Sequence, residues 1–307
     1  MASELSALEK KKKVKRSKLK IKRDITGWAF VIVSVVSIGL FYFYPMIQSF
    51  LLSFQSGTGA NLEFVGLANY KRLLQDPTFL TATKNTLLFL VFQVPVMVLL
   101  AIFFSTLLNN KTLKWKGIFR TIVFLPSVTS LVAYSIVFKY LFSNNGIVNK
   151  ILMNLSLIDN PVLWLSDPFW AKVLIVLAIT WRWTGYNMIF FLSAIQNISP
   201  EIYEAARIDG ASNREQFFKI TVPLLKPVIL FTSVTSTIGT LQLFDEPMNI
   251  TRGGPGSATT TISQYIYNLS FKYTPDFGYA AAVSYAIVIL VIIFSIIQFK
   301  VGGNDRD

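Results

Sequence analysis

Six long apolar stretches constrain this 307-residue chain more than any other feature of its sequence. An α-helix needs about 20 apolar residues to cross a hydrocarbon core about 30 Å thick. Stretches of that length run over about 27–50, 85–108, 118–142, 169–192, 224–244 and 280–301. Because backbone groups in lipid must satisfy their own hydrogen bonds, these stretches predict an all-α polytopic membrane protein with six transmembrane helices.

The composition excludes several classes of protein. Hydrophobic residues make up 53% of the chain and charged residues 15%, whereas soluble domains carry roughly 25% charged residues. This balance argues against a soluble enzyme and against a disordered protein. The absence of Cys and His excludes disulfides, Cys/His zinc sites and His-based catalytic triads. We therefore expect no catalytic, metal or cofactor site in this chain.

Three prolines, Pro45, Pro95 and Pro126, lie inside or near the apolar stretches. Since only a helix satisfies the backbone in lipid, we expect them to kink the helices rather than end them. The 224–244 stretch is rich in Ser and Thr, whose hydroxyls can donate to carbonyls of their own helix. These prolines and hydroxyls are therefore compatible with all six predicted spans.

The basic residues predict the orientation. Roughly 20 of the 29 Lys and Arg fall on one side if the N-terminus is cytoplasmic, and about eight fall on the other. Because cytoplasmic loops are enriched in Lys and Arg, both termini are expected in the cytoplasm. The predicted organisation is a basic tail over 1–24, a transmembrane domain over 25–302 and a short tail over 303–307.

The tail over 1–24 carries ten Lys and Arg against three acidic residues, about half of the net charge of +13. A solvated tail that fixes the orientation of the first span explains this run. A nucleic-acid arm is the alternative, but no aromatic residue for base stacking lies among the lysines. We expect the chain to contact lipid and not nucleic acid.

The two larger outer loops have the turn signals of ordered segments. Asn144-Asn145-Gly146 and Gly253-Gly254-Pro255-Gly256 predict tight turns. Apolar residues over 261–271 have helical spacing and predict a short helix. This helix either lies in the membrane interface or packs against other outer loops.

The segment over 196–223, between the fourth and fifth spans, is too polar to enter lipid. Ser199 followed by Pro200 predicts the start of a helix, and Gly210 permits the left-handed conformation that ends it. The result is a short polar helix on the cytoplasmic side.

Ser212 and Glu215 have the spacing of a capping box, which predicts a second helix that Pro223 ends. The small residues around the turn allow another surface to approach closely, as a helix docking in a groove requires. A membrane-surface helix–turn–helix without a partner explains the same features equally well.

One family has a matching segment here. Glu204-Ala205-Ala206, then Gly210, Ile220 and Pro223, resembles the EAA motif of ABC importer permeases. The fuller run, Tyr203-Glu204-Ala205-Ala206 with Ile208-Asp209-Gly210-Ala211, resembles the carbohydrate-uptake branch of maltose and multiple-sugar type. Three further stretches are similar to that branch: Trp183-Thr184-Gly185-Tyr186-Asn187-Met188, Gly253-Gly254-Pro255 followed by Thr259-Thr260-Thr261, and Phe277-Gly278-Tyr279-Ala280-Ala281-Ala282.

The resemblance implies a permease subunit of a sugar importer in a bacterial inner membrane. It implies a second related permease subunit, two ATPase subunits below and an extracytoplasmic sugar-binding protein above. It also implies that the 196–223 loop docks in a cleft of the ATPase through Glu204, Ala205, Ala206, Asp209, Gly210 and Ala211. ATP and Mg would bind to the ATPase, since this chain has no GxxxxGK[ST] sequence.

Sugars need aromatic faces and hydrogen-bonding side chains together. Two of the predicted spans offer both. The candidates are Trp181, Trp183, Tyr186 and Asn187 in the fourth span, and Ser236, Thr240, Gln242 and Phe244 in or beside the fifth. Helix packing or an interfacial aromatic belt is the alternative role for each aromatic residue.

Arg182 is the one charge deep in a predicted span, so it should not face lipid. It can pair with Asp245 or Glu246, or it can attract an anionic substrate such as a glycerol phosphate. Three rival functions also stay open. One is a permease of the same class for glycerol phosphate or another small solute. A secondary transporter would need intramembrane acidic or His residues, which are nearly absent, and a membrane enzyme would need clustered carboxylates.

Overall fold

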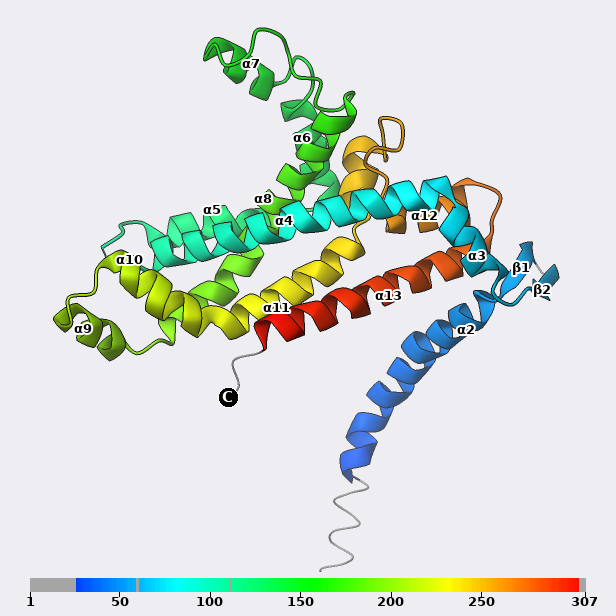
Figure 1. Cartoon of the computed structure of the whole chain (residues 1–307), viewed down its shortest axis with the longest axis horizontal. Helices are drawn as coiled ribbons and strands as arrows, with labels where there is room; N and C mark the ends of the chain where they lie inside the picture. Colours follow the sequence, from blue (N-terminus) through cyan, green and yellow to red (C-terminus); the bar gives the residue numbers. More distant parts are fainter. Residues whose placement is uncertain (1–25, 59–60, 111, 304–307) are drawn as a thin grey trace, which may run out of the picture.

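The computed structural model describes residues 26–58, 61–110 and 112–303. The basic tail predicted over 1–24 and residues 304–307 lie outside this part of the chain. Four long helices form the body of the molecule (Figure 1). They are α4 (Pro77–Asn109), α8 (Pro168–Gln196), α11 (Val222–Leu241) and α13 (Phe277–Gly302). The all-α polytopic fold predicted from the apolar stretches is confirmed.

Shorter elements connect the long helices. Before α4 lie η1 (Gly39–Phe43), α2 (Tyr44–Leu52), the hairpin strands β1 (Gln55–Thr58) and β2 (Asn61–Phe64), and α3 (Ala68–Gln75). Between α4 and α11 lie α5 (Lys116–Val128), α6 (Leu131–Leu141), α7 (Ile147–Asn154), α9 (Pro200–Ile208), α10 (Asn213–Gln216) and η2 (Phe217–Thr221). After α11 come η3 (Pro247–Thr251), α12 (Ile262–Tyr267) and η4 (Asn268–Lys272). The hairpin pairs antiparallel, with Gln55 opposite Phe64.

The stretch predicted as a span over 118–142 is not one continuous helix. It forms α5 and α6, which are bent by 103°. α5 continues two residues past Pro126, and the chain then extends at Thr129 and Ser130, where ψ is 143° and 129°. The predicted kink at Pro126 is therefore a break, and α6 and α7 stand out from the body (Figure 1). Five other helices are long and apolar enough to cross a membrane.

The first helix, Thr26–Leu52, joins the body only near its C-terminal end and is otherwise unburied in this chain. There the Tyr285 hydroxyl donates to the Met46 carbonyl at 2.7 Å. Pro45 follows a π-helical turn, η1, in which Tyr44 N–H donates to the Gly39 carbonyl. The wider turn moves carbonyls away from the proline ring, so the helix continues as predicted.

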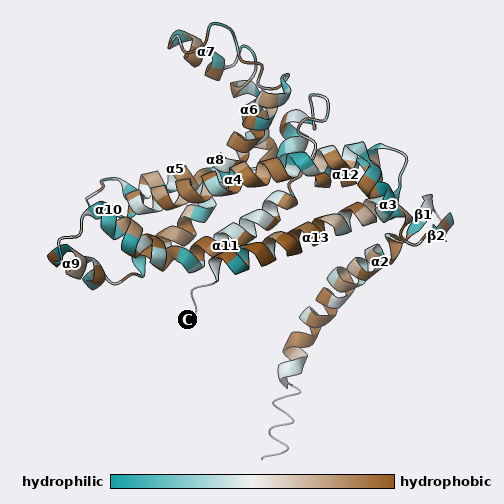
Figure 2. Cartoon of the chain, in the orientation of Figure 1, coloured by the Kyte–Doolittle hydropathy of each residue, from teal (hydrophilic) through white to brown (hydrophobic). Residues whose placement is uncertain are grey.

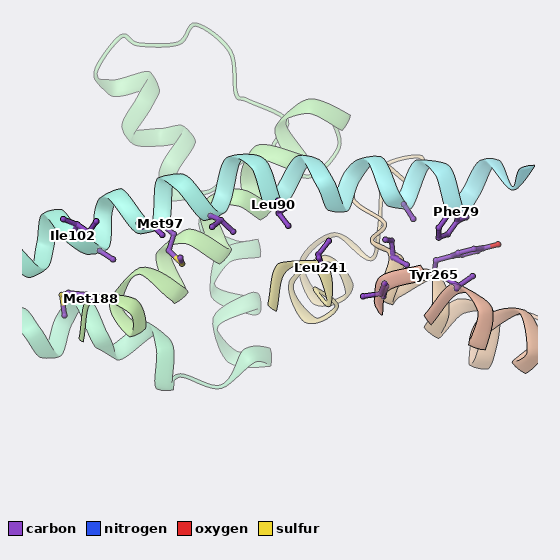
Figure 3. Packing of buried hydrophobic residues seen from close by; sticks show 14 of the residues in the cluster. Phe79, Leu90, Met97, Ile102, Met188, Leu241 and Tyr265 are labelled. Atoms are coloured by element: carbon purple, nitrogen blue, oxygen red, sulfur yellow. The ribbon is translucent and has the colours of Figure 1, made fainter. Parts of the chain in front are cut away.

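The hydrophobic core runs along α4. Met97 and Ala101 are fully buried in a cluster that also contains Met188 of α8, Leu241 of α11 and Tyr265 of α12 (Figure 3). At the α8–α5 contact, a Cβ on Gly185 would lie 1.9 Å from the Val123 carbonyl oxygen, so only glycine allows this approach. The outward faces of α4 and α13 remain apolar, as lipid contact requires (Figure 2).

The predicted 261–271 helix exists as α12 with η4, and its apolar side chains pack inward. Ile262, Tyr265 and Leu269 are each at most 5% exposed. The Thr261 hydroxyl donates to the Leu243 carbonyl at 2.6 Å, and Ile262 N–H donates to Thr86 at 3.1 Å. Of the two alternatives, packing against the protein is therefore the one observed.

Asp76 ties three of these elements together where α4 begins. Its Oδ1 caps α4 by accepting from Thr78 N–H at 2.8 Å. Its Oδ2 accepts from the hydroxyls of Tyr265 at 2.5 Å and Tyr279 at 2.7 Å. The α8 helix has a simpler cap, in which Asp167 accepts only from backbone N–H groups.

We expect Asp76→Asn to lower the free energy of unfolding by about 2–3 kcal/mol, because the amide nitrogen cannot accept from the two tyrosines. Asp167→Asn, which keeps its capping oxygen, should cost less than about 1 kcal/mol. Thermal unfolding in detergent at neutral pH measures both. Equal costs would contradict the role assigned to the tyrosine hydrogen bonds.

Acidification should destabilise the protein through the Asp76 carboxylate. Burial acts to raise the pKa of Asp76, but the hydrogen bonds from Tyr265, Tyr279 and the backbone outweigh it and lower the pKa. The stabilisation is therefore complete above the ordinary carboxyl pKa of about 3.9 and is lost as the pH falls through the lower folded-state pKa. Asp76→Asn should flatten this part of the stability–pH curve.

Candidate functional site

The segment over 196–223 forms an exposed elbow of two helices, α9 and α10, at one end of the bundle (Figure 1). Gly210 has φ +80° and closes the turn after α9. Ser212 and Glu215 form the predicted capping box, with Ser212 Oγ accepting from Glu215 N–H at 3.3 Å. The hydrogen bond from Ser212 N–H and the contact with Lys219 lower the pKa of Glu215 to about 2. The cap therefore stays ionised at neutral pH.

The local predictions for the elbow differ from the structure at two residues. Ser199 is the residue before α9 as predicted, but its side chain makes no capping hydrogen bond. Pro223 does not end the second helix, because α10, η2 and α11 form one continuous helix over Asn213–Leu241. The π-turn η2 ends at Thr221, two residues before Pro223, and closes with Val222 N–H donating to the Phe217 carbonyl. The elbow is therefore a direct extension of the fifth span.

Side chains fasten the elbow to this long helix. The hydroxyls of Tyr203 and Thr221 lie 2.9 Å apart, and Gln216 Nε2 donates to the Ala211 carbonyl at 2.9 Å. α9 and the turn after it are therefore tied to η2 and α10.

The outer surface of the elbow is free in this chain. Four of the predicted docking residues are exposed and two, Ala206 and Ala211, are half-buried; the exposed ones are Glu204, Ala205, Asp209 and Gly210. Ile208, beside them, is 87% exposed. An apolar side chain this exposed, next to small residues, gives the elbow a surface that another protein can cover.

A cavity of about 90 Å³ lies between α4, α8 and α11, and we call it the inner cavity. It brings together Trp183, Tyr186, Asn187, Ser236 and Thr240 from the two candidate spans. Thr240 Oγ1 lies 2.8 Å from Gln93 Oε1, and Asn187 Nδ2 lies 3.2 Å from Met97 Sδ. Aromatic faces and hydrogen-bonding groups therefore meet at one place, as a polyol site requires.

Three predicted candidates lie outside the inner cavity. Trp181 packs on Tyr134 and Phe138 at 6.1 and 5.4 Å between ring centroids. Phe244 packs on Tyr267 at 5.3 Å, and Gln242 is exposed at the C-terminal end of α11. Helical spacing alone did not distinguish these positions, because α11 ends at Leu241, before Gln242 and Phe244.

Sequence reasoning missed Gln93, which comes from α4. Gln93 is 1% exposed, and its amide contacts Thr240 and Met97. The available signal was that Gln93 is the one amide in the interior of the 85–108 stretch, which also begins with Asn85; a buried polar group in a span needs a partner. Within the described residues, no group of three or more Asp, Glu, His and Cys side chains could hold a metal ion.

Arg182 pairs with Glu246 rather than with Asp245. Its Nη1 lies 3.3 Å from Glu246 Oε1, and the side chains are 12% and 3% exposed. The guanidinium carbon also lies 5.5 Å from the Tyr134 ring and 5.2 Å from the Trp183 ring. The pair links α8, beside the inner cavity, to the segment that leads from α11 into η3.

We expect Arg182→Gln to destabilise the protein by about 3–5 kcal/mol, because it leaves the buried Glu246 carboxylate without a cation. Arg182→Gln/Glu246→Gln should recover most of the loss, since neither charge then stays buried alone. Unfolding in detergent measures both. A single variant as stable as the unsubstituted protein would show that the pair is not structural.

Comparisons with known proteins agree with this geometry. Residues 85–301 match the family model described as "Binding-protein-dependent transport system inner membrane component". The chain is 54% identical over 293 residues to the lactose transport system permease protein LacF of Rhizobium radiobacter, covering 95% of this chain and 98% of that one. It is 36% identical over 286 residues to the arabinooligosaccharides transport system permease protein AraP of Bacillus subtilis (strain 168), covering 91% and 89%.

The fold has a solved counterpart. The structure is similar, with a TM-score of 0.81 and 25% identity, to a chain of a bacterial ABC transporter involved in the import of the acidic polysaccharide alginate, covering 95% of this chain and all of that one. A second structure, with a TM-score of 0.78 and 26% identity, shows the alginate transporter in complex with an alginate pentasaccharide-bound periplasmic protein, covering 92% and 95%. The sequence matches, the fold match and the exposed elbow agree with one another. This chain therefore belongs to the family of inner membrane components of binding-protein-dependent transport systems.

Proposed function

We propose that this multi-pass inner membrane permease imports a sugar or oligosaccharide and is driven by ATP bound to partner subunits. The observation that best supports this proposal is the continuous helix Asn213–Leu241, which joins the exposed elbow to residues that line the inner cavity. A displacement of the elbow would therefore act directly on the cavity wall. The sugar specificity of the 54%-identical lactose permease supports the substrate class.

The elbow would dock in a cleft of a cytoplasmic ATPase. Ala205, Gly210 and Ile208 would enter the cleft, with Glu204 and Asp209 offering charges to its basic groups. Closure of two ATPase subunits would then move the elbow, α10 and α11 as one body. This is alternating access by rigid-body rotation about an interface, in which the site opens to one side at a time.

This assignment implies an orientation and partners. The elbow must be cytoplasmic, which agrees with the surplus of Lys and Arg on that side and puts both termini inside. A sugar-binding protein would deliver substrate to the opposite face. A second, related permease subunit would complete the pore.

The size of the inner cavity supports a shared pore. About 90 Å³ holds roughly three water molecules, whereas small-molecule sites have volumes of about 300–1,000 Å³. A sugar would therefore contact the wall formed by Trp183, Asn187, Ser236 and Thr240 only when a second subunit faces it or when the helices separate.

We expect Gly210→Pro and Glu204→Lys to reduce ATP-driven sugar uptake at least about tenfold while the subunit remains in the membrane. Proline cannot adopt the positive φ of Gly210, and lysine reverses the charge offered to the ATPase. Uptake by cells, together with immunodetection of the subunit in membranes, measures the effect.

Glu63→Lys is the matched control, because it makes the same charge change on the exposed hairpin strand β2, away from the elbow. It should leave uptake unchanged. Normal uptake by both elbow variants would contradict docking, and uptake without the ATPase would favour a secondary transporter.

The inner cavity has its own test. Removing the hydroxyl in Thr240→Val should raise the KM for sugar uptake by about tenfold, equivalent to roughly 1.4 kcal/mol, because one hydrogen bond to the polyol is lost. Ser284→Ala removes a hydroxyl from α13 that donates only to its own helix, so its KM should stay constant. A glycerol phosphate taken up in preference to sugars would favour the alternative substrate.

A further inference from the structure

A larger hollow lies toward the other end of the bundle from the elbow. Its volume is about 580 Å³, within the range of small-molecule sites. It lies between α6 on one side and η3, α12 and η4 on the other, and we call it the outer hollow. Leu243 lines the inner cavity and Met248 lines the outer hollow, so the two spaces follow each other along the same stretch of chain.

The outer hollow carries uncompensated positive charge. Lys139, Arg252 and Lys272 line it, and no acidic residue is among its described lining residues. The ion pairs seen within 26–58, 61–110 and 112–303 involve other cations. Three unpaired cations around one space favour an anionic group in it.

A buried amide in the wall lacks a partner. Gln264 is 2% exposed, and its Oε1 accepts no hydrogen bond within the described structure. Its Nε2 has only a weak contact at 3.7 Å with Met248 Sδ. Because a buried carbonyl without a donor is costly, a hydroxyl or water bound beside this oxygen would satisfy it.

The glycine run before this helix makes room for the amide. A Cβ on Gly253 would lie 3.0 Å from both Nε2 and Oε1 of Gln264 and 2.6 Å from Thr260 Oγ1. Gly253 also has φ +82°, which disfavours any side chain. Gly253 therefore leaves room for the Gln264 amide in the wall of the hollow.

Aromatic rings supply the apolar part of the wall. Tyr267 and Phe271 line the hollow, with ring centroids 5.5 Å apart, and Phe244 packs behind Tyr267. Phe271 is 73% exposed. Rings beside amides and cations provide the three kinds of group that bind a sugar ring, its hydroxyls and an acidic substituent.

We propose that the outer hollow is a second saccharide subsite, selective for sugars that carry a carboxylate or another anionic group. Gln264 accepts from a sugar hydroxyl, Tyr267 and Phe271 contact the ring, and Lys139, Arg252 and Lys272 hold the anion. The proposal rests on the proposed import of sugars. It adds a binding site at the outer hollow that a sugar would occupy before it reaches the inner cavity.

The test is equilibrium binding of radiolabelled digalacturonate and of neutral lactose to the assembled importer in nanodiscs, without ATP or binding protein. Lys139→Gln/Lys272→Gln should weaken digalacturonate binding by about tenfold and reduce its salt dependence, with lactose binding unchanged. Gln264→Leu should weaken binding of both sugars. Lys150→Gln, which changes a cation of α7 that does not line the hollow, is the matched control and should change neither.

Digalacturonate binding that is no tighter than lactose binding, or that survives the double Lys variant, overturns the proposal. A second measurement adds the sugar-binding protein: a double variant that weakens only capture of that protein also overturns the proposal, because the cations would then form a protein docking face. ATP-driven lactose uptake by the same variants separates the two hypotheses. If the variants take up lactose but the digalacturonate binding test contradicts the subsite, only the subsite hypothesis is rejected. If even the unsubstituted complex takes up no sugar, the proposed importer function is rejected.

Discussion

The need to satisfy backbone hydrogen bonds without water governs this structure. It explains why the chain in the membrane is helical and why its prolines are accommodated in different ways. Pro95 lies inside α4, which continues past it as one helix. Pro45 and Pro223 each follow a π-turn, η1 and η2, in which the donor bonds five residues back. Pro126 has no such turn, and the helix breaks soon after it. The two π-turns keep long helices continuous where a break would separate their ends.

The continuity at η2 has the largest consequence for function. Because α10, η2 and α11 form one helix, the exposed elbow and the hydroxyls of Ser236 and Thr240 belong to one rigid body. In the mechanism we propose, a displacement of the elbow reaches the inner cavity through this helix without an intervening loop. The Arg182–Glu246 pair ties the segment that follows this helix to α8. In the mechanism we propose, coupling depends on the stiffness of this helix and on the surfaces at its two ends.

Helix-cap chemistry made the elbow predictable, whereas the cavity needed tertiary contacts. The capping box at Ser212 and the positive φ of Gly210 follow from residues three or fewer positions apart. Thr240 could be suggested from its helix face, but its partner Gln93 comes from 147 residues earlier. Trp181 and Phe244 resembled site residues because aromatic side chains look alike in sequence whether they stack on one another or line a cavity.

The sequence by itself determined the helical class, the number of apolar stretches, the elbow and the membrane orientation we propose, because these depend on local hydropathy, caps and charge counts. Tertiary structure decided the 103° bend between α5 and α6, the inward packing of α12 and the choice of Glu246 over Asp245 as the partner of Arg182. Each of these depends on which distant side chains share a buried volume. Packing, hydrogen-bond satisfaction and charge pairing inside that volume are properties of the assembled helices, and no single stretch of sequence contains them.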